Sequence, residues 1–254
     1  MTTPPIIKER IGHTMVVTLN DPDRLNPISA STREALSEVL VEVEADPSFR
    51  AIILTGAGSN FSSGGDISAM DAPMRLKRIN FEHVKRMVNQ ITGASVPVIA
   101  AVEGWAAGAG LALAMLCDTV VASESARFMS AFPKIGLIPD YGLLASLPAR
   151  VGQARARQIM LYAKPLTADT ALSYGMIDEM VADGTALKAA LELTEHLNTL
   201  APEALRAIKA FDSGRLDHAL DYERNVQPQL MASDNAKEGR AAFFEKRASN
   251  FTAS

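Results

Sequence analysis

The 254-residue chain is poor in the residues that build disulfides and metal sites. A single cysteine, Cys117, excludes a disulfide within the chain. One thiol and a few scattered histidines give no recognisable metal-ligand spacing, the histidines being His13, His83, His196 and His218. We therefore expect no metal and a reducing, cytoplasmic setting.

A basic surplus and a long apolar run are also missing. Lysine and arginine number 25 against 29 acidic residues, a net charge of −4, whereas a non-specific binder of nucleic acid or anionic membrane needs an excess of cations. The most apolar run, residues 105–117, is shorter than the ~20 residues of a membrane span, and MTTPPIIKER has no signal-peptide pattern. The expected partners include neither nucleic acid nor a membrane.

The first half of the chain alternates strand-like and helix-like patterns. Short β-rich runs predict strands at 14–19, 50–55, 96–102 and 119–122. Ser31 and Glu34 form a capping-box pattern that predicts a helix to about Glu44, and an apolar stripe from Leu76 to Ile91 predicts a helix over 72–91. This alternation is typical of an α/β fold.

The second half has a different pattern. After Asp140 the strand-like runs disappear, and helices are predicted over 187–200, 216–231 and 235–246. We expect an α/β core over residues 1–195 and a helical region over 196–254.

Two predicted strands each lead into a turn of glycine, alanine and serine, and the second turn opens an alanine-rich helix. Small residues let a ligand approach the backbone, and two such turns could place N–H groups on one oxygen as an oxyanion hole. The alternative is that Gly64-Gly65 and Gly108-Ala109-Gly110 are only tight turns. A dinucleotide site is disfavoured because neither turn has the third glycine of its fingerprint, and the chain has no P-loop or GxSxG motif.

Longer segments around these turns resemble one family. The runs LTGAGSNFSSGGDISAM, PVIAAVEGWAAGAGLALAMLCD and ARFMSAFPKIGLIPDYG are similar to successive motifs of the crotonase (enoyl-CoA hydratase/isomerase) superfamily. DPDRLNPIS and EGRAAFFEKRASNF match its two edges. The resemblance implies a spiral of ββα units with a C-terminal helical trimerisation region, assembled as a homotrimer or a dimer of trimers. It also implies an acyl-CoA substrate, with coenzyme A as part of that substrate and no separate cofactor.

The resemblance assigns roles to individual residues. The two backbone donors of the oxyanion hole fall on Gly65 and on Ala109, which lies between Gly108 and Gly110. Asp66, beside the first donor, more often braces that turn than acts on substrate. The residues implied to contact substrate or coenzyme A are Arg24 and Leu25 through their backbone, Ser63 through its carbonyl, Gly64, Asp66, Gly108, Phe132, Tyr141, and Phe243 and Lys246 from a neighbouring subunit. Phe243 and Lys246 also fit an ordinary exposed, cationic helix end.

The chain departs from the family at the two glutamates that hydratases use. Ala112 and Phe132 occupy those positions, and neither can transfer a proton. Asp140 remains, at the place where dienoyl-CoA isomerases and ring-1,2-epoxyphenylacetyl-CoA isomerases have an acid–base aspartate. Apolar neighbours would raise its pKa, although an aspartate there also fits an N-cap for a helix over 141–147. Tyr141 either donates to substrate or packs.

One carboxylate that removes a proton and returns it elsewhere suits an isomerisation. We therefore expect an acyl-CoA isomerase, most similar to the ring-1,2-epoxyphenylacetyl-CoA isomerase-like members, with an acyl pocket walled by the 72–91 helix. The alternatives are an enoyl-CoA hydratase with an unusual base and a catalytically silent acyl-CoA binding protein.

Overall fold

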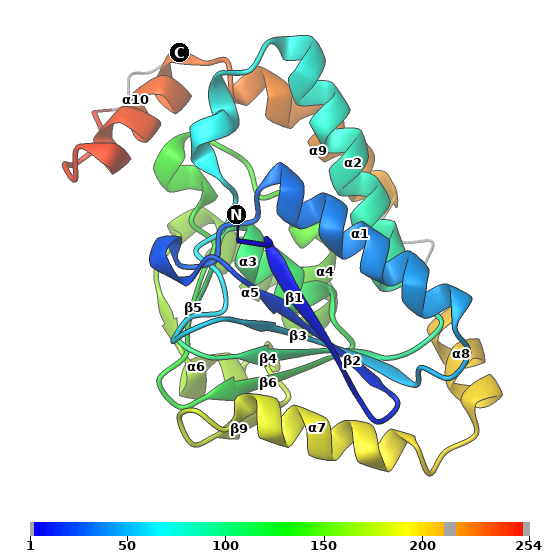
Figure 1. Cartoon of the computed structure of the whole chain (residues 1–254). Helices are drawn as coiled ribbons and strands as arrows, with labels where there is room; N and C mark the ends of the chain where they lie inside the picture. The colour runs from blue at the N-terminus through cyan, green and yellow to red at the C-terminus, as the bar shows by residue number, and fades with distance from the viewer. Residues whose placement is uncertain (1–2, 211–216, 251–254) are drawn as a thin grey trace.

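A six-stranded sheet forms the centre of the protein in a computed structural model that describes residues 3–210 and 217–250 (Figure 1). Its strand order is β1-β2-β3-β4-β6-β9. β1 is antiparallel to β2, and all the other neighbours are parallel. The bounds are β1 Ile6–Ile11, β2 Thr14–Leu19, β3 Ala51–Gly56, β4 Val98–Val102, β6 Thr119–Ser123 and β9 Glu179–Val181.

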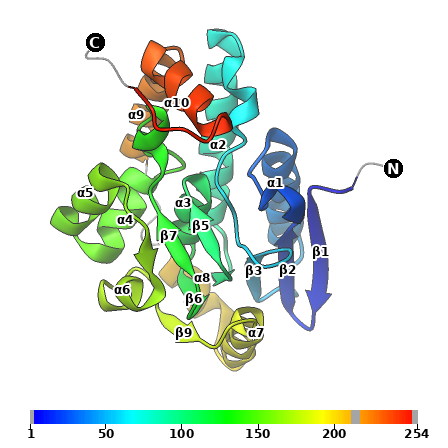
Figure 2. The ribbon, with the colours of Figure 1, turned by 90° about the vertical axis from the view of Figure 1, so that its left-hand side faces the viewer.

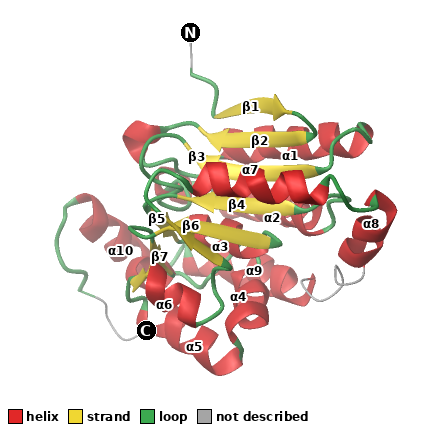
Figure 3. Ribbon diagram, turned by 90° about the horizontal axis from the view of Figure 1, so that it is seen from below, coloured by secondary structure: helices red, strands yellow, loops and turns green. Residues whose placement is uncertain are grey.

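Helices cover both faces of this sheet because its strands are apolar on both faces. In β3, Ile53 packs toward α7 (Ala186–Leu197), whereas Ile52 and Leu54 belong to the larger core on the other face. That face is covered by α1 (Ala30–Ala45), α2 (Met74–Thr92) and α3 (Ala109–Leu116). Figure 1 shows α7 below the sheet and α1 and α2 above it, and Figure 3 shows α7 lying over the sheet, roughly along the strands.

A second, three-stranded sheet and further helices complete the fold (Figure 2). The strands are β5 (Trp105–Ala107), β7 (Arg127–Met129) and β8 (Leu166–Thr167). The remaining helices are α4 Leu143–Val151, α5 Gln153–Tyr162, α6 Ala168–Ser173, α8 Pro202–Ala210, α9 Asp217–Leu230 and α10 Asp234–Phe244, with short 3₁₀ helices η1 Pro22–Arg24, η2 Ile67–Asp71 and η3 Phe132–Ile135. α9 packs against α2 and α4, and α10 packs against η3.

The predicted strands of the first half are confirmed as β2, β3, β4 and β6, with ends shifted by at most two residues. The expectation that strands disappear after Asp140 is wrong, because β8 and β9 follow it; each has no more than three residues, too few to show a period-2 pattern. β1 was not expected either. Five of its six side chains are exposed, among them Ile7 and Ile11, so it lacks the apolar run of a buried strand.

The helix predictions need two corrections. The N-cap of α1 is Ser29 rather than Ser31, and its hydroxyl accepts the Thr32 N–H at 3.1 Å. Leu76 and Ile79 of the predicted stripe on α2 are about 40% exposed, whereas the later residues of that stripe are buried. None of the helices in the described part of the chain is long and apolar enough to cross a membrane.

The three C-terminal helices predicted from the sequence are observed as α7, α9 and α10. Leu216, where the second was expected to begin, and Phe251, at the end of the last matching motif, lie outside the described residues. The division into 1–195 and 196–254 stays a prediction.

Asn26 joins the loops that follow η1 and β3. Its side-chain Nδ2 donates to the carbonyls of Ala57 and Asn60 at 2.9 and 2.7 Å, and its Oδ1 accepts the Asp21 N–H at 3.0 Å. Its carbonyl accepts from the Ser62 hydroxyl at 2.7 Å. Because Asn26 is buried and its φ of 55° favours asparagine over most side chains, this position sets the course of both loops.

We predict that Asn26→Ala lowers the free energy of unfolding by about 3 kcal/mol, since it leaves three partly buried backbone groups without their partner. Asn20→Ala, which removes one hydrogen bond to Pro4 near the surface, is the matched control and should cost about 1 kcal/mol. Urea unfolding measures both. Equal losses would contradict the special role of Asn26.

Candidate active site

The segment that follows β3 lies beside the segment that follows β4. The Phe61 N–H donates to the Glu103 carbonyl at 2.7 Å. Ser62 donates to Trp105 at 2.9 Å and accepts from Ala107 at 3.0 Å. The carboxyl ends of neighbouring parallel strands meet at one edge of a sheet, which is where α/β proteins bind ligands. The two glycine turns predicted from the sequence therefore meet there.

The two turns are in van der Waals contact at positions without side chains. A Cβ on Gly64 would lie 3.0 Å from the Ala107 carbonyl oxygen and 3.5 Å from the Ala109 nitrogen. A Cβ on Gly108 would lie 3.7 Å from Gly64 Cα. Their φ angles of 116° and 51° also favour glycine. Glycine at both positions lets the backbones approach.

Two backbone N–H groups at this contact are available to a ligand. Ile28 donates to the Gly64 carbonyl and accepts from Asp66, so the extended chain turns the Gly65 N–H to the opposite side. Ala109 is the first residue of α3, where an N–H has no acceptor within the helix. Among the described residues, neither N–H donates a hydrogen bond. Gly65 and Ala109, the two residues predicted as oxyanion donors, thus each have a free N–H beside the contact between the two turns.

The first turn is braced by its own polar residues. Asp66 accepts hydrogen bonds from the backbone and hydroxyl of Ser68 and forms an ion pair with Arg24 at 3.1 Å. Burial opposes ionisation of Asp66, but these bonds outweigh it and lower its pKa. The Ser63 N–H donates to the Leu25 carbonyl at 2.8 Å. The residues predicted to bind coenzyme A, Arg24 and Leu25 in one loop and Ser63 and Asp66 in the other, are therefore adjacent.

Asp140 is buried, with 8% of its surface exposed. Its Oδ2 accepts from Gln227 Nε2 at 2.9 Å, whereas its Oδ1 is buried with no partner in the described part of the chain. Burial raises the pKa of Asp140 to about 7, despite the opposing effects of the Gln227 hydrogen bond and of Arg33. A carboxyl with that pKa and a free oxygen is suited to acid–base chemistry near neutral pH.

Asp140 does not cap a helix with its side chain. α4 begins at Leu143, its N-cap is Gly142, and no side chain bonds to the cap. The helix predicted over 141–147 is therefore observed as α4, which begins two residues later than predicted. The reason is that Tyr141 and Gly142 have φ angles of 54° and 75°, which a right-handed helix does not accept.

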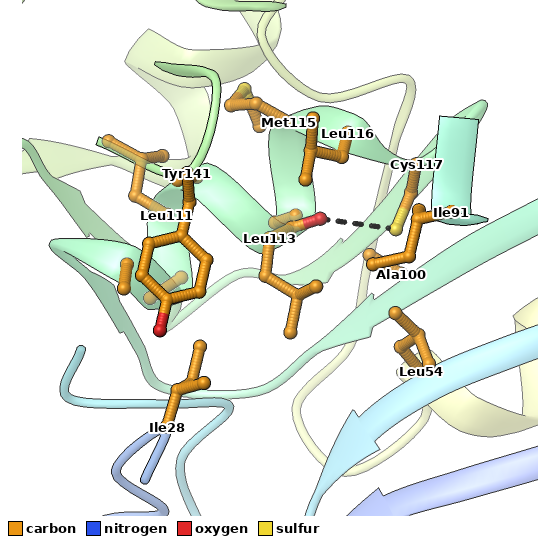
Figure 4. Packing of buried hydrophobic residues seen from close by; sticks show 14 of the residues in the cluster. Ile28, Leu54, Ile91, Ala100, Leu111, Leu113, Met115, Leu116, Cys117 and Tyr141 are labelled. Carbon is orange, nitrogen blue, oxygen red and sulfur yellow. Dashed lines mark hydrogen bonds between the residues drawn. The ribbon is translucent and has the colours of Figure 1, made fainter. Parts of the chain in front are cut away.

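Tyr141 connects the Asp140 turn to the glycine turns. Figure 4 shows its ring beside Leu111 of α3, with the hydroxyl directed toward Ile28. Arg33 Nη1 donates both to that hydroxyl at 3.2 Å and to the Ile28 carbonyl at 3.4 Å. Because Ile28 is bridged to Gly65 and Leu111 lies in the first turn of α3, Tyr141, the residue directly after Asp140, lies beside the segments that carry both free N–H groups.

The other predicted residues fall into two groups. Ala112 and Phe132 are buried, so the positions of the hydratase glutamates are apolar. Phe243 and Lys246 are exposed at the end of α10.

Cys117 is buried and donates to the Leu113 carbonyl (Figure 4), and burial raises its pKa to about 12, as expected for a core thiol.

Two residues that the sequence did not single out contact the Asp140 turn. Glu223 and Gln227 lie one helical turn apart on α9 and are both buried. Glu223 accepts the Gly142 N–H, and Gln227 bonds both Asp140 and Ile138. The only sequence signal was a pair of polar residues at i, i+4 on a helix, which is usual for a solvated face.

Comparison with known proteins adds three findings. The model of a family described as enoyl-CoA hydratase/isomerase matches residues 9–254. The chain is 39% identical to the 1,2-epoxyphenylacetyl-CoA isomerase of Escherichia coli (strain K12) over 94% of both chains, and 33% identical to the short-chain-enoyl-CoA hydratase of Clostridium acetobutylicum over 95% of both. The crystal structure of an enoyl-CoA hydratase from Mycobacterium avium subsp. paratuberculosis K-10 matches with a TM-score of 0.89 and 32% identity, covering 98% of this chain and 99% of that one. The resemblance and the crotonase-like α/β fold expected from the sequence are confirmed.

We predict that Asp140→Asn changes how stability depends on pH. The folded-state pKa of about 7 lies above that of an unfolded aspartate, so the stability that protonated Asp140 contributes is complete below about pH 4 and is lost as the pH rises to about 7. Relative to the variant, the wild type should lose up to about 4 kcal/mol of unfolding free energy across that window. Denaturant unfolding at a series of pH values measures it, and parallel curves for the two proteins would contradict the burial of an ionisable Asp140.

Proposed function

Because the chain belongs to the enoyl-CoA hydratase/isomerase family, we propose that it isomerises an unsaturated acyl-CoA thioester by moving a double bond or rearranging a ring epoxide. The observation that carries this proposal is Asp140, a buried carboxyl with a pKa near neutrality and an unpartnered oxygen. Its neighbours at the two hydratase glutamate positions, Ala112 and Phe132, offer no second proton donor or base.

The thioester oxygen accepts hydrogen bonds from the N–H groups of Gly65 and Ala109. Negative charge that develops on this oxygen is stabilised by donors already in place and by the N-terminal end of α3. The contact of the two glycine turns supports this role because Gly65 and Ala109 directly follow the two glycines in contact, Gly64 and Gly108. Gly64 and Gly108 contribute because, having no side chains, they let the two turns come into contact.

Asp140 then moves one proton. For a β,γ-unsaturated substrate, ionised Asp140 removes a proton from the α-carbon, and the electron pair passes to the thioester oxygen as a dienolate. The same carboxyl, now protonated, returns the proton to the γ-carbon, and the C–O double bond re-forms with a double bond between the α- and β-carbons. The reaction needs no metal or redox group, so we propose no cofactor beyond the coenzyme A of the substrate.

The loops around the first turn are proposed to hold the coenzyme A portion. Arg24 and Leu25 present their backbone, and the Ser63 carbonyl, which accepts no hydrogen bond from the described residues, is free for the adenine amino group. Phe243 and Lys246 are exposed and are proposed to reach the nucleotide end of a neighbouring subunit in a trimer or dimer of trimers. Tyr141 is proposed to lie beside the acyl group, and the expected compartment is the cytoplasm.

Hydration of an enoyl-CoA is the second candidate, and it is favoured by the names of several relatives, among them the hydratase of Clostridium acetobutylicum. It requires the enzyme to orient water and to protonate the α-carbon, which a single carboxyl does less readily than two. A mass-spectrometric screen separates the candidates, because hydration adds the mass of water and isomerisation leaves the mass unchanged.

We predict that β,γ-unsaturated or ring-epoxide acyl-CoA thioesters are converted to isomers of equal mass, and that Asp140→Asn lowers kcat by about 10²-fold or more while the Kd for acyl-CoA changes little. Asp169→Asn, an exposed aspartate of α6, is the control and should leave kcat unchanged. Hydrated products from a crotonyl thioester would favour the hydratase. Tight binding with no product from any substrate would favour a silent binding protein, and full activity of Asp140→Asn would remove Asp140 from the mechanism.

A further prediction concerns the second donor. Proline is well tolerated at the first position of a helix but has no N–H, so Ala109→Pro should keep α3 while lowering kcat by about 10²- to 10³-fold. Ala109→Gly keeps the donor and should retain activity. Circular dichroism verifies the fold of both variants, and normal turnover by a folded Ala109→Pro protein would exclude that N–H as a donor.

A further inference from the structure

A second buried carboxyl contacts the turn that carries Asp140. Glu223 of α9 is 1% exposed, and its Oε1 and Oε2 accept the Gly142 N–H at 2.9 and 3.0 Å. One helical turn later, Gln227 donates from Nε2 to Asp140 Oδ2 at 2.9 Å and to the Ile138 carbonyl at 3.0 Å. Its Oε1 accepts the Ile138 N–H at 3.2 Å. One face of α9 therefore holds the chain on both sides of Asp140.

The turn needs this support because its backbone is unfavourable without it. Tyr141 and Gly142 both have positive φ angles, and for a bulky side chain such as tyrosine this strained conformation persists only where the surrounding structure enforces it. The Gly142 N–H that results is directed at α9, where both Glu223 oxygens share it. Glu223 thus acts on Asp140 through the backbone between them.

The charged groups around the two carboxyls decide their protonation. The nearest cation is Arg33 of α1, which donates to the Tyr141 hydroxyl and the Ile28 carbonyl rather than to a carboxylate. On α2 and α9, Lys85 pairs with Asp221 and Arg224 pairs with Glu82. α3 has no titratable residue, and within the described residues no cation forms an ion pair with Asp140 or Glu223.

Asp140 in the turn and Glu223 on α9 are both buried without an ion-pair partner among the described residues, so the two carboxyls do not both stay ionised at neutral pH. Burial, together with the nearby charge of Asp140, raises the pKa of Glu223 to about 9, and burial raises that of Asp140 to about 7. The pair titrates as a unit and loses its second proton at the higher value. Between these values the remaining proton stays on Glu223, because its burial and the charge of Asp140 outweigh the Gly142 N–H bond, which favours the ionised form.

We propose that Glu223 is a positioning residue that remains protonated during turnover, holds the Asp140 turn through the Gly142 N–H, and leaves Asp140 as the single ionised carboxyl of the site. This inference rests on the proposed isomerase function. A neutral Glu223 adds no negative charge beside the enolate, whereas an ionised Glu223 would repel it. Ionisation of Glu223 should therefore lower turnover on the alkaline side.

The decisive variant is Glu223→Gln, which keeps an oxygen for the Gly142 N–H and is neutral at every pH. We expect the wild-type kcat to rise through about pH 7 and to fall near pH 9, whereas the variant keeps kcat within about threefold at pH 7 and loses the alkaline fall. Glu223→Leu removes the acceptor and should lower kcat by about 10²-fold with little change in KM, because the turn moves while the substrate contacts remain.

Glu195→Gln, an exposed glutamate of α7, is the matched control and should keep the wild-type pH profile. An alkaline fall that persists in Glu223→Gln would overturn the proposal, since another group would then cause it. Loss of activity in Glu223→Gln at every pH would also overturn it, because Glu223 would then have to act in its ionised form.

Infrared spectroscopy tests the same proton without any turnover. At pH 8 the wild type should show the carbonyl band of a buried protonated carboxyl, which Glu223→Gln should lose. In Asp140→Asn the band should still be present in acid but should disappear at a lower pH than in the wild type, because the charge of Asp140 no longer raises the pKa of Glu223. If the band shows this pattern but no thioester is isomerised, the proposed function is wrong and the inference that Glu223 is protonated holds. If thioesters are isomerised but the band is absent or insensitive to Glu223→Gln, the inference fails and the function stands.

Discussion

The contact between two main-chain turns is the constraint on which the candidate site depends. Gly64 and Gly108 approach so closely that a Cβ on Gly64 would lie 3.0 Å from the Ala107 carbonyl oxygen. The approach is possible because the segments after β3 and β4 are hydrogen-bonded to each other and because Asn26 holds the loops alongside. Without it the N–H groups of Gly65 and Ala109 would lie on separate surfaces rather than beside one contact.

Asp140, the proposed acid–base residue, is buried at a cost in stability. A carboxyl in water has a low pKa, and burial of Asp140 without a cation works against its ionisation. The same burial gives the group a pKa near neutrality, where a base is most effective. Support comes from α9, which is more than 80 residues away in the chain, so the C-terminal helices are part of the candidate site as well as of the fold.

The sequence predicted much of this arrangement where patterns are local. Runs such as RAIILT and TVVA identified buried strands, and glycines directly after strands identified the turns. The prediction failed where a longer-range contact decides the local structure. β8 and β9 are too short to show a period, and Ser29 rather than Ser31 caps α1 because the chain enters the helix two residues earlier than the capping-box pattern indicates.

The amino-acid sequence alone determined the α/β class, the family resemblance, the two small-residue turns and the aspartate, because each is written in neighbouring residues. Only the tertiary structure decided that the turns touch, that Asp140 is buried with one free oxygen, and that Glu223 and Gln227 hold it. Those facts depend on which distant segments pack together, and in the sequence a buried glutamate on a helix looks the same as a solvated one.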